Sequence, residues 1–303
     1  MMNLHLDKTL FNDIAQEASY HLKIDKEIII HDYFVSHLLE KIFFENKYYV
    51  FKGGTSLSKC YRIIDRYSED IDLGIDVDFS SFTISQKKDI NKRVLNSVKN
   101  SDLDLLDEKF RSGRDYNTIK VNLKGKDAYS SSIKIETFFE VVSFPCEETE
   151  AKTYIYDFLK LKNRKDLIEK YNLNPIKVKT QNYVTTFIEK IFAICDYYET
   201  DDFNRNSRHL YDLKNLYERI SFDDEFFKTF DKVRKIRFNS RSATRLSAKP
   251  EYDIVEGLKN IIKNKSFKND YNKITTTLIF HETSYEECEN VLKKILEKFE
   301  KKS

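Results

Sequence analysis

The chain of 303 residues has few of the residues that interrupt regular structure, with only three prolines and six glycines. This scarcity predicts helices and strands joined by short connections. Cysteine is also scarce, and Cys60, Cys146, Cys195 and Cys288 form neither a CxxC pair nor a Cys/His metal spacing. The spacing therefore argues against a disulfide framework and a zinc site, and we expect reduced thiols in a cytoplasmic protein.

Membrane signals and an excess of one charge are missing as well. The first residues show no signal-peptide pattern, and no apolar run approaches the roughly 18 residues of a transmembrane helix. The 52 lysines and arginines nearly balance the 50 aspartates and glutamates, giving a formal net charge of +2. We expect a soluble, intracellular protein. Its net charge does not indicate nucleic-acid binding, so any basic surface must be local.

The most informative segment runs from Phe51 to Asp78. An apolar stretch ending at Phe51 predicts a short strand, and a glycine-rich turn with two hydroxyl residues follows it: Gly53, Gly54, Thr55 and Ser56. From Asp70 onward aspartates alternate with aliphatic residues, which predicts a half-buried strand. Its carboxylates then share one face, with Asp70 and Asp72 about 6.6 Å apart along the strand.

This combination points to metal-assisted phosphoryl or nucleotidyl transfer. Two carboxylates on one strand face repel each other unless a cation lies between them. Mg²⁺ suits such oxygen ligands and completes its coordination with substrate phosphates. Glycines let the backbone approach a ligand, and amides at a helix N-terminus favour anions. A lone Asp-x-Asp is common on exposed strands and a lone Gly-Gly-Thr-Ser is usually only a turn, so the inference depends on their occurring together.

The segment KGGTSLSKCYRIIDRYSEDIDLGI closely resembles the signature of the AbiEii/AbiGii-type nucleotidyltransferase toxins. These abortive-infection, toxin–antitoxin proteins belong to the DNA polymerase β-like nucleotidyltransferase superfamily. The resemblance implies an NTP substrate and Mg²⁺ or Mn²⁺, with Asp70 and Asp72 as metal ligands. It also implies that the glycine-rich turn binds the nucleotide phosphates through Gly53, Gly54, Thr55 and Ser56.

A third carboxylate is expected on a neighbouring strand. In the stretch SIKIE, Lys134 and Glu136 alternate with Ile133 and Ile135. The superfamily places a carboxylate beside Asp-x-Asp that helps to hold metal or accepts the proton of an attacking hydroxyl. Glu136 is the candidate, and an ordinary surface glutamate on an edge strand is the alternative.

Two downstream helices resemble the third and fourth motifs of the family. In VTTFIEKIFAICDYYE, Lys190 borders an apolar stripe, and the resemblance implies that it binds the triphosphate. In RNSRHLYDLKNLYERI, Asp212 would hold Lys190 or the nucleotide; the structural alternative is an interhelical salt bridge, and the two are compatible. Arg208 and His209 stand where many members carry Lys-Asp, which weakens any role for the aspartate of that pair but leaves Asp212 intact. Arg66, just before the aspartates, is expected to contact phosphate or to pair with Asp70.

The pattern of elements predicts an α/β (α+β) nucleotidyltransferase domain with a mixed sheet over 1–175. A mainly α-helical domain over 176–303 would follow and complete the nucleotide cleft. Strands are expected at 47–52, 70–78, 116–123 and 132–142, with a short strand or connector at 175–179. Helices are expected at 7–22, 26–44, 57–64, 85–99 and 151–172, and then at 183–200, 207–220, 223–235, 251–263, 267–281 and 284–300.

One segment suggests a polymeric substrate. KVRKIRFNSRSATRLSAK, residues 232–249, has seven basic residues and no acidic one, a composition that suits a nucleic-acid backbone. The candidate RNA contacts in it are Arg234, Arg237, Arg241 and Arg245. The resemblance further implies a toxin with a separately encoded antitoxin and an RNA acceptor, the 3′ end of tRNA, for growth control or phage defence. Nucleotidylation of a protein or small molecule is one alternative, and a catalytically silent binding module is another.

Overall fold

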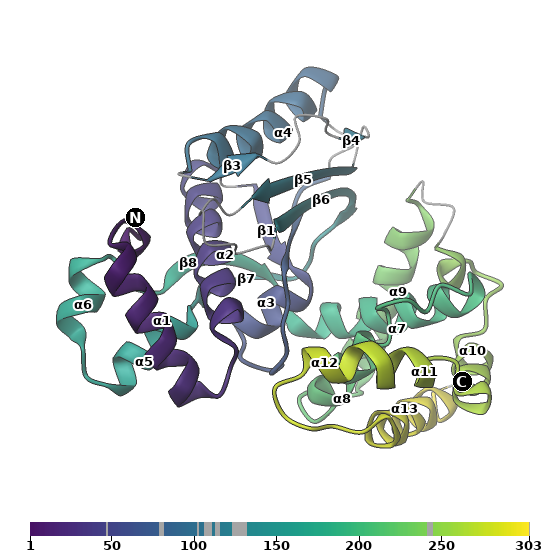
Figure 1. Cartoon of the computed structure of the whole chain (residues 1–303). Coiled ribbons are helices and arrows are strands. Elements are labelled where there is room, and N and C mark those ends of the chain that lie inside the picture. The colour runs from purple at the N-terminus through teal and green to yellow at the C-terminus, as the bar shows by residue number, and fades with distance from the viewer. Residues whose placement is uncertain are drawn as a thin grey trace. The chain divides into compact units, whose positions relative to one another are not determined.

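The computed structural model describes residues 1–46, 48–78, 82–101, 103–105, 111–112, 116–122, 132–240 and 245–302. The chain forms two compact units (Figure 1). Unit 1 comprises Met1–Tyr61 and Ser68–Gln181, and unit 2 comprises Arg62–Tyr67 and Asn182–Ser303. The fold is mixed α/β, as predicted. The expected domain boundary was residue 175, but the strand Ile176–Gln181 belongs to unit 1. The segment Arg62–Tyr67, from the N-terminal part of the chain, belongs to unit 2.

Unit 1 is built on a mixed sheet. Its strands in the described residues are β1 (Tyr49–Lys52), β2 (Asp70–Ile75), β3 (Asp104–Leu105), β4 (Arg111–Ser112), β5 (Tyr116–Asn122), β6 (Ser132–Val142), β7 (Cys146–Ala151) and β8 (Ile176–Gln181). They lie in the order β3-β5-β6-β2-β1-β8-β7, with β4 beside β5. The β2–β6 and β1–β8 pairs are parallel and the other pairs are antiparallel.

Helices pack around this sheet. They are α1 (Lys8–Leu22), α2 (Lys26–Glu45), α3 (Gly53–Lys59), α4 (Ile84–Lys99), α5 (Tyr154–Leu161) and α6 (Lys165–Lys170), preceded by a short turn η1 (Leu4–Leu6). The helix α2 is the centre of the unit, because it contacts α1, α4, α5 and the sheet and its Ile29, Ile30 and Leu38 are fully buried. Asp25 is its N-cap residue, although its side chain makes no capping hydrogen bond.

Unit 2 is helical in its described residues. It contains α7 (Tyr183–Glu199), α8 (Arg208–Tyr217), α9 (Asp224–Phe238), η3 (Leu246–Ala248), α10 (Ile254–Asn264), α11 (Lys268–Asp270), the π-helical turn η4 (Tyr271–Thr275), α12 (Thr276–Leu278) and α13 (Tyr285–Glu300). The segment Arg62–Tyr67 packs with these helices without forming a helix or a regular strand. Tyr67 N donates to Leu278 O and Phe280 N donates to Asp65 O, on either side of an antiparallel bridge between Arg66 and Ile279.

Most predicted elements are present, and the differences have local causes. The strand predicted at 132–142 is β6, whereas the helix expected to run to Ile64 ends at Lys59 because the next residues extend into unit 2. The strand predicted at 70–78 ends at Ile75, after which the chain bends. The single helical stretch expected over 151–172 is instead the end of β7 followed by two short helices.

Candidate active site

The glycine turn lies directly against one of the predicted metal ligands. In the antiparallel pair of β1 and β2, Lys52 is opposite Asp72, and α3 begins at the next residue, Gly53. Gly53 has a φ of +76°, a conformation that residues with a side chain rarely adopt. A Cβ at Gly53 would lie 2.1 Å from Asp72 Oδ2. The turn and the carboxylate therefore meet only because this position has no side chain.

The two hydroxyl residues of the turn bind the protein backbone. Thr55 Oγ1 donates to the carbonyl of Asp70 and also hydrogen-bonds Ser68 Oγ at 2.8 Å, and Ser56 Oγ donates to Gly53 O at 2.9 Å. Both side chains are buried. They hold the turn against the start of β2, so a phosphate contact here would come from backbone amides. The N-cap residue Lys52 offers those amides no side-chain hydrogen bond.

The carboxylates gather on one face of the sheet. In the parallel pair of β2 and β6, Asp70 is aligned with Lys134 and Asp72 with Glu136. Aligned residues point to the same side of a sheet, and residues two apart share a face. We call Asp70, Asp72, Lys134 and Glu136 the carboxylate face. The residues that alternate with them along the two strands point to the opposite side and are fully buried: Ile71, Leu73, Ile133 and Ile135. This burial fixes the strand register.

Lys134 lies among these carboxylates and was not singled out as a site residue from the sequence. Its Nζ is 3.0 Å from Glu136 Oε2 and 3.8 Å from Asp70 Oδ2. The exposed fractions of the three side chains are 34% for Lys134, 18% for Asp70 and 14% for Glu136. The signal in the sequence was the alternation of SIKIE, which already placed Lys134 on the side of Glu136.

The donor set fits a divalent cation that is held by few protein ligands. Carboxylate oxygens are the ligands that Mg²⁺ and Mn²⁺ prefer, and Mg²⁺ is usually bound by one or two carboxylates together with substrate phosphates. Among the described residues, no group of three His, Cys, Asp or Glu side chains is arranged to hold a metal ion. The two carboxylates of Asp70 and Asp72 fit this kind of site.

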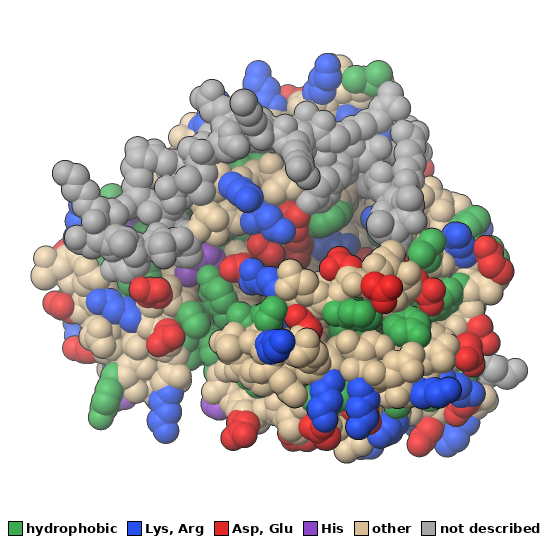
Figure 2. All heavy atoms as spheres, turned by 45° about the vertical axis from the view of Figure 1, so that its right-hand side comes forward, with side chains coloured by type: hydrophobic (Ala, Val, Ile, Leu, Met, Phe, Trp, Pro, Cys, Tyr) green, Lys and Arg blue, Asp and Glu red, His purple; other side chains and the backbone are tan. Residues whose placement is uncertain are grey.

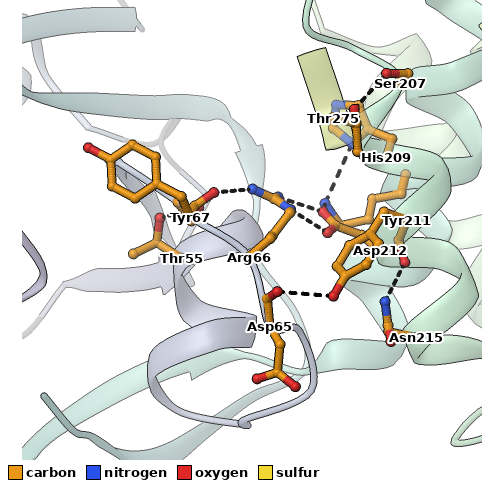
Figure 3. Close-up of polar contacts among 12 residues, drawn as sticks. Thr55, Asp65, Arg66, Tyr67, Ser207, His209, Tyr211, Asp212, Asn215 and Thr275 are labelled. Carbon is orange, nitrogen blue, oxygen red and sulfur yellow. Dashed lines mark hydrogen bonds and ion pairs between the residues drawn. The ribbon is translucent and has the colours of Figure 1, made fainter. Parts of the chain in front are cut away.

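Unit 2 contains a second charged cluster, centred on Asp212 of α8. The Arg66 guanidinium binds both carboxylate oxygens, with Nε–Oδ1 at 2.7 Å and Nη2–Oδ2 at 2.8 Å (Figure 3). From α7, Lys190 Nζ lies 2.6 Å from Asp212 Oδ2. We call Arg66, Lys190 and Asp212 the buried cluster, since at most 5% of any of them is exposed. Lys190 and Asp212 thus form the interhelical salt bridge that was one of the two expected arrangements.

The pKa shifts in this cluster follow from burial and from its excess of positive charge. Burial alone would raise the pKa of Asp212, but Arg66 and Lys190 outweigh it and hold this pKa far below its usual value. Burial lowers the pKa of Lys190, and Arg66 adds to this while Asp212 opposes it. Burial of the His209 ring and the nearby Lys190 lower the pKa of His209 as well. Two cations therefore share one carboxylate.

The segment that carries Arg66 is held by further contacts. Tyr211 Oη donates to Asp65 O at 3.1 Å, one residue before Arg66 (Figure 3). At the start of α8, Ser207 Oγ hydrogen-bonds Thr275 Oγ1 at 2.6 Å, which ties the helix to η4. Sequence reasoning missed Asp212 as the partner of Arg66, because the two residues are 146 positions apart.

The candidate RNA contacts differ from one another in burial and in the groups that they contact. Arg237 pairs with Asp196 at 2.6 Å, and the Arg234 guanidinium lies 5.5 Å from the centre of the Phe230 ring. Both arginines are packing residues of α9, whereas Lys232 and Lys235 of the same helix are exposed. Arg245 is half-buried, and Arg241 lies outside the described residues. On the face in Figure 2, basic and acidic side chains are interspersed, in keeping with the balanced charge.

Comparisons with known proteins found a family model and a solved structure that match this chain. The family model for the nucleotidyl transferase AbiEii toxin of type IV toxin–antitoxin systems matches residues 37–300, which include every motif described above. The fold is similar to that of MenT4, a nucleotidyltransferase toxin from Mycobacterium tuberculosis H37Rv. The TM-score is 0.51 at 14% identity, over 93% of this chain and 98% of that one.

Among curated proteins none matches this chain. No helix in the described residues is long and apolar enough to cross a membrane. The match of the family model covers most of the chain and contains both the carboxylate face and the buried cluster. The chain belongs to the AbiEii nucleotidyltransferase toxin family.

Proposed function

We propose that this toxin transfers a nucleoside monophosphate from an NTP to an RNA, at the 3′ end of tRNA, with Mg²⁺ as its metal. The observation that carries the proposal is the strand register that places Asp70, Asp72 and Glu136 on one face beside the Gly53 turn. Such a modification of tRNA would halt translation in the cytoplasm, for growth control or phage defence, until the antitoxin of the system counteracts it.

The carboxylate face supplies the chemistry of the transfer. Asp70 and Asp72 hold the metal, which when bound would neutralise charge on the triphosphate. The acceptor hydroxyl attacks the α-phosphorus, the bond from this phosphorus to the bridging oxygen of the β-phosphate breaks, and pyrophosphate leaves. Glu136 accepts the hydroxyl proton or helps to hold the metal.

The phosphates are bound by the glycine turn and by lysine charge. The backbone amides of Gly54, Thr55 and Ser56 open α3, and the side chains of Thr55 and Ser56 keep this turn in place. Lys190 steadies the triphosphate through its charge, while Asp212 holds the lysine. Replacing Lys190 with methionine should then raise the KM for NTP, whereas the melting temperature should change little.

The RNA acceptor is supported by exposed basic side chains on two helices. On α4 these are Lys88, Lys92, Arg93 and Lys99, and on α9 they are Lys228, Lys232 and Lys235. Basic side chains on a helix surface bind the phosphate backbone without regard to sequence, and such binding weakens steeply with salt. A protein or small-molecule acceptor would have no need of them.

The test is transfer of label from each α-labelled NTP to total RNA in the presence of Mg²⁺. Wild type is compared with Asp70→Asn and with Asp76→Asn, a matched control whose carboxylate follows β2 and pairs with Lys179 at 2.8 Å. Label in a tRNA-sized band with wild type and Asp76→Asn only is the expected result. Absence of label in RNA from folded protein would overturn the RNA acceptor, and equal label with Asp70→Asn would overturn the metal site.

A further inference from the structure

We propose that Lys134 is the resident cation of the carboxylate face. Its ammonium group holds Asp70 and Glu136 while no metal is bound, and it competes with the metal for Asp70. The inference rests on the proposed function, because it assumes that Asp70 is a metal ligand. It goes further in giving a role to a lysine that the proposed mechanism does not use.

The position of Lys134 is set by the sheet rather than by a flexible loop. Its neighbours Ile133 and Ile135 are fully buried, so the Lys134 side chain must emerge on the carboxylate face. The parallel register aligns it with Asp70, and Glu136 follows two residues later on the same face. The ammonium therefore lies between two strands that both carry carboxylates, 3.0 Å from Glu136 and 3.8 Å from Asp70.

Charge explains why the position matters. Asp70, Asp72 and Glu136 bring three negative charges to one face, and like charges held close together repel each other. Lys134 offsets part of this repulsion in the metal-free enzyme. A divalent cation at Asp70 would then lie near a positive charge, and it must displace the ammonium from at least one carboxylate oxygen.

Two consequences follow for metal binding. Without nucleotide, Lys134 should weaken metal binding about tenfold, because a unit positive charge some 5 Å from a divalent cation repels it even in a water-like medium. With nucleotide, the phosphates supply ligands to the metal and a negative partner to Lys134, so the penalty falls. The structure thus favours entry of the metal together with the nucleotide.

The test uses Mn²⁺ alone, titrated into the full chain without nucleotide, with free Mn²⁺ measured by electron paramagnetic resonance. Lys134→Met should bind Mn²⁺ about tenfold more tightly than wild type, and Lys134→Gln should do the same. Lys134→Arg, which keeps the charge, should resemble wild type. Lys179→Met is the matched control, because Lys179 pairs with Asp76 in the same unit and is 33% exposed against 34% for Lys134.

The outcomes separate this inference from the proposed function. If Asp70→Asn weakens Mn²⁺ binding but Lys134→Met and Lys134→Gln leave it unchanged or weaker, the role of Lys134 is wrong and the metal site stands. If Lys179→Met tightens binding as much as Lys134→Met, net charge rather than position is responsible, and the inference is again wrong. If Asp70→Asn binds Mn²⁺ as well as wild type, the metal site and the role of Lys134 fall together.

Discussion

The carboxylate face of unit 1 and the buried cluster of unit 2 both join lysine to aspartate, but they differ in burial and in charge balance. On the carboxylate face Lys134 lies within 4 Å of Asp70 and Glu136, and these three side chains are 14% to 34% exposed. In the buried cluster one carboxylate meets two cations, and Asp212 is completely buried. The first lies near solvent, and the second has an excess of positive charge inside the protein.

This difference indicates different tasks. Partly exposed carboxylates can exchange an ammonium for a metal ion, because water shares the cost of the change. A buried ion pair has little such freedom, since removing one partner leaves an uncompensated charge in the protein interior. We therefore propose that catalysis takes place at the carboxylate face and that Asp212 holds Arg66 and Lys190. The predictions below test this division in order of decreasing effect on stability.

The largest effect is expected from Asp212→Asn. It leaves the guanidinium of Arg66 and the ammonium of Lys190 buried without a counter-charge, which should lower the free energy of unfolding by about 3–5 kcal/mol. Lys190→Met is the matched comparison, because it leaves a balanced pair of Arg66 and Asp212 and should cost much less. Denaturant unfolding measures both. Equal losses in the two variants would contradict the role of Asp212 as the shared partner.

The pH dependence of stability should show whether burial also sets the pKa of a titratable group in unit 1. His31 of α2 is only 1% exposed, and burial lowers its pKa from 6.5 to about 4. The unfolded chain therefore binds a proton that the folded chain excludes. Protonation of His31 therefore does not reduce the free energy of unfolding above about pH 6.5. As the pH drops toward 4, it lowers this free energy by roughly 3 kcal/mol in total.

The measurement is the free energy of unfolding against pH for His31→Gln and for His281→Gln, whose side chain is exposed. The slope between pH 6.5 and 4 should flatten in the first variant and persist in the second. A slope that is unchanged in His31→Gln would show that burial of this ring is not its source.

Gly53→Ala should disturb the carboxylate face through the backbone. The positive φ and the approach of Asp72 to 2.1 Å from a Cβ predict a loss of about 1–3 kcal/mol. Displacement of Asp72 should also lower the rate of transfer by up to about 100-fold. Gly54→Ala is the control for stability, because Gly54 has no positive φ. If the two variants unfold at the same temperature, the close approach at Gly53 is not needed.

The smallest effect on stability is expected from Lys134→Met. Its ion pairs are partly exposed, so the free energy of unfolding should change by less than about 1 kcal/mol, even though Mn²⁺ binding tightens. Thermal unfolding in the absence of metal measures this. A loss as large as that of Asp212→Asn would mean that the carboxylate face is as rigidly paired as the buried cluster, and the comparison would fail.

The sequence predicted those parts of the molecule that depend on local pattern. The alternation at Ser132–Val142 predicted β6 with its bounds, and the apolar stripe around Phe187 and Ile191 predicted α7. It did not predict β7, Cys146–Ala151, because this strand lies at the edge of the sheet and its glutamates are exposed. An edge strand needs no regular apolar face.

In the site, too, the sequence predicted the features that depend on a local pattern and missed those that depend on distant residues. Asp70, Asp72 and Glu136 were named from alternation and family resemblance, and the register brings them to one face. The binding of Arg66 to Asp212 depends on two segments 146 residues apart, and no local pattern indicates such a contact. The burial of Thr55 and Ser56 was also invisible, because a hydroxyl that binds a phosphate and one that binds a backbone carbonyl look alike in a sequence.

The most direct test of the account is the rate of nucleotide transfer under single-turnover conditions for Asp70→Asn and Asp76→Asn. Both variants remove one carboxylate charge from the same stretch of chain, but only Asp70 belongs to the carboxylate face. The account predicts that Asp70→Asn loses at least about 100-fold in rate while remaining folded, and that Asp76→Asn keeps the rate of wild type. Equal rates in the two variants would show that catalysis does not take place at the carboxylate face.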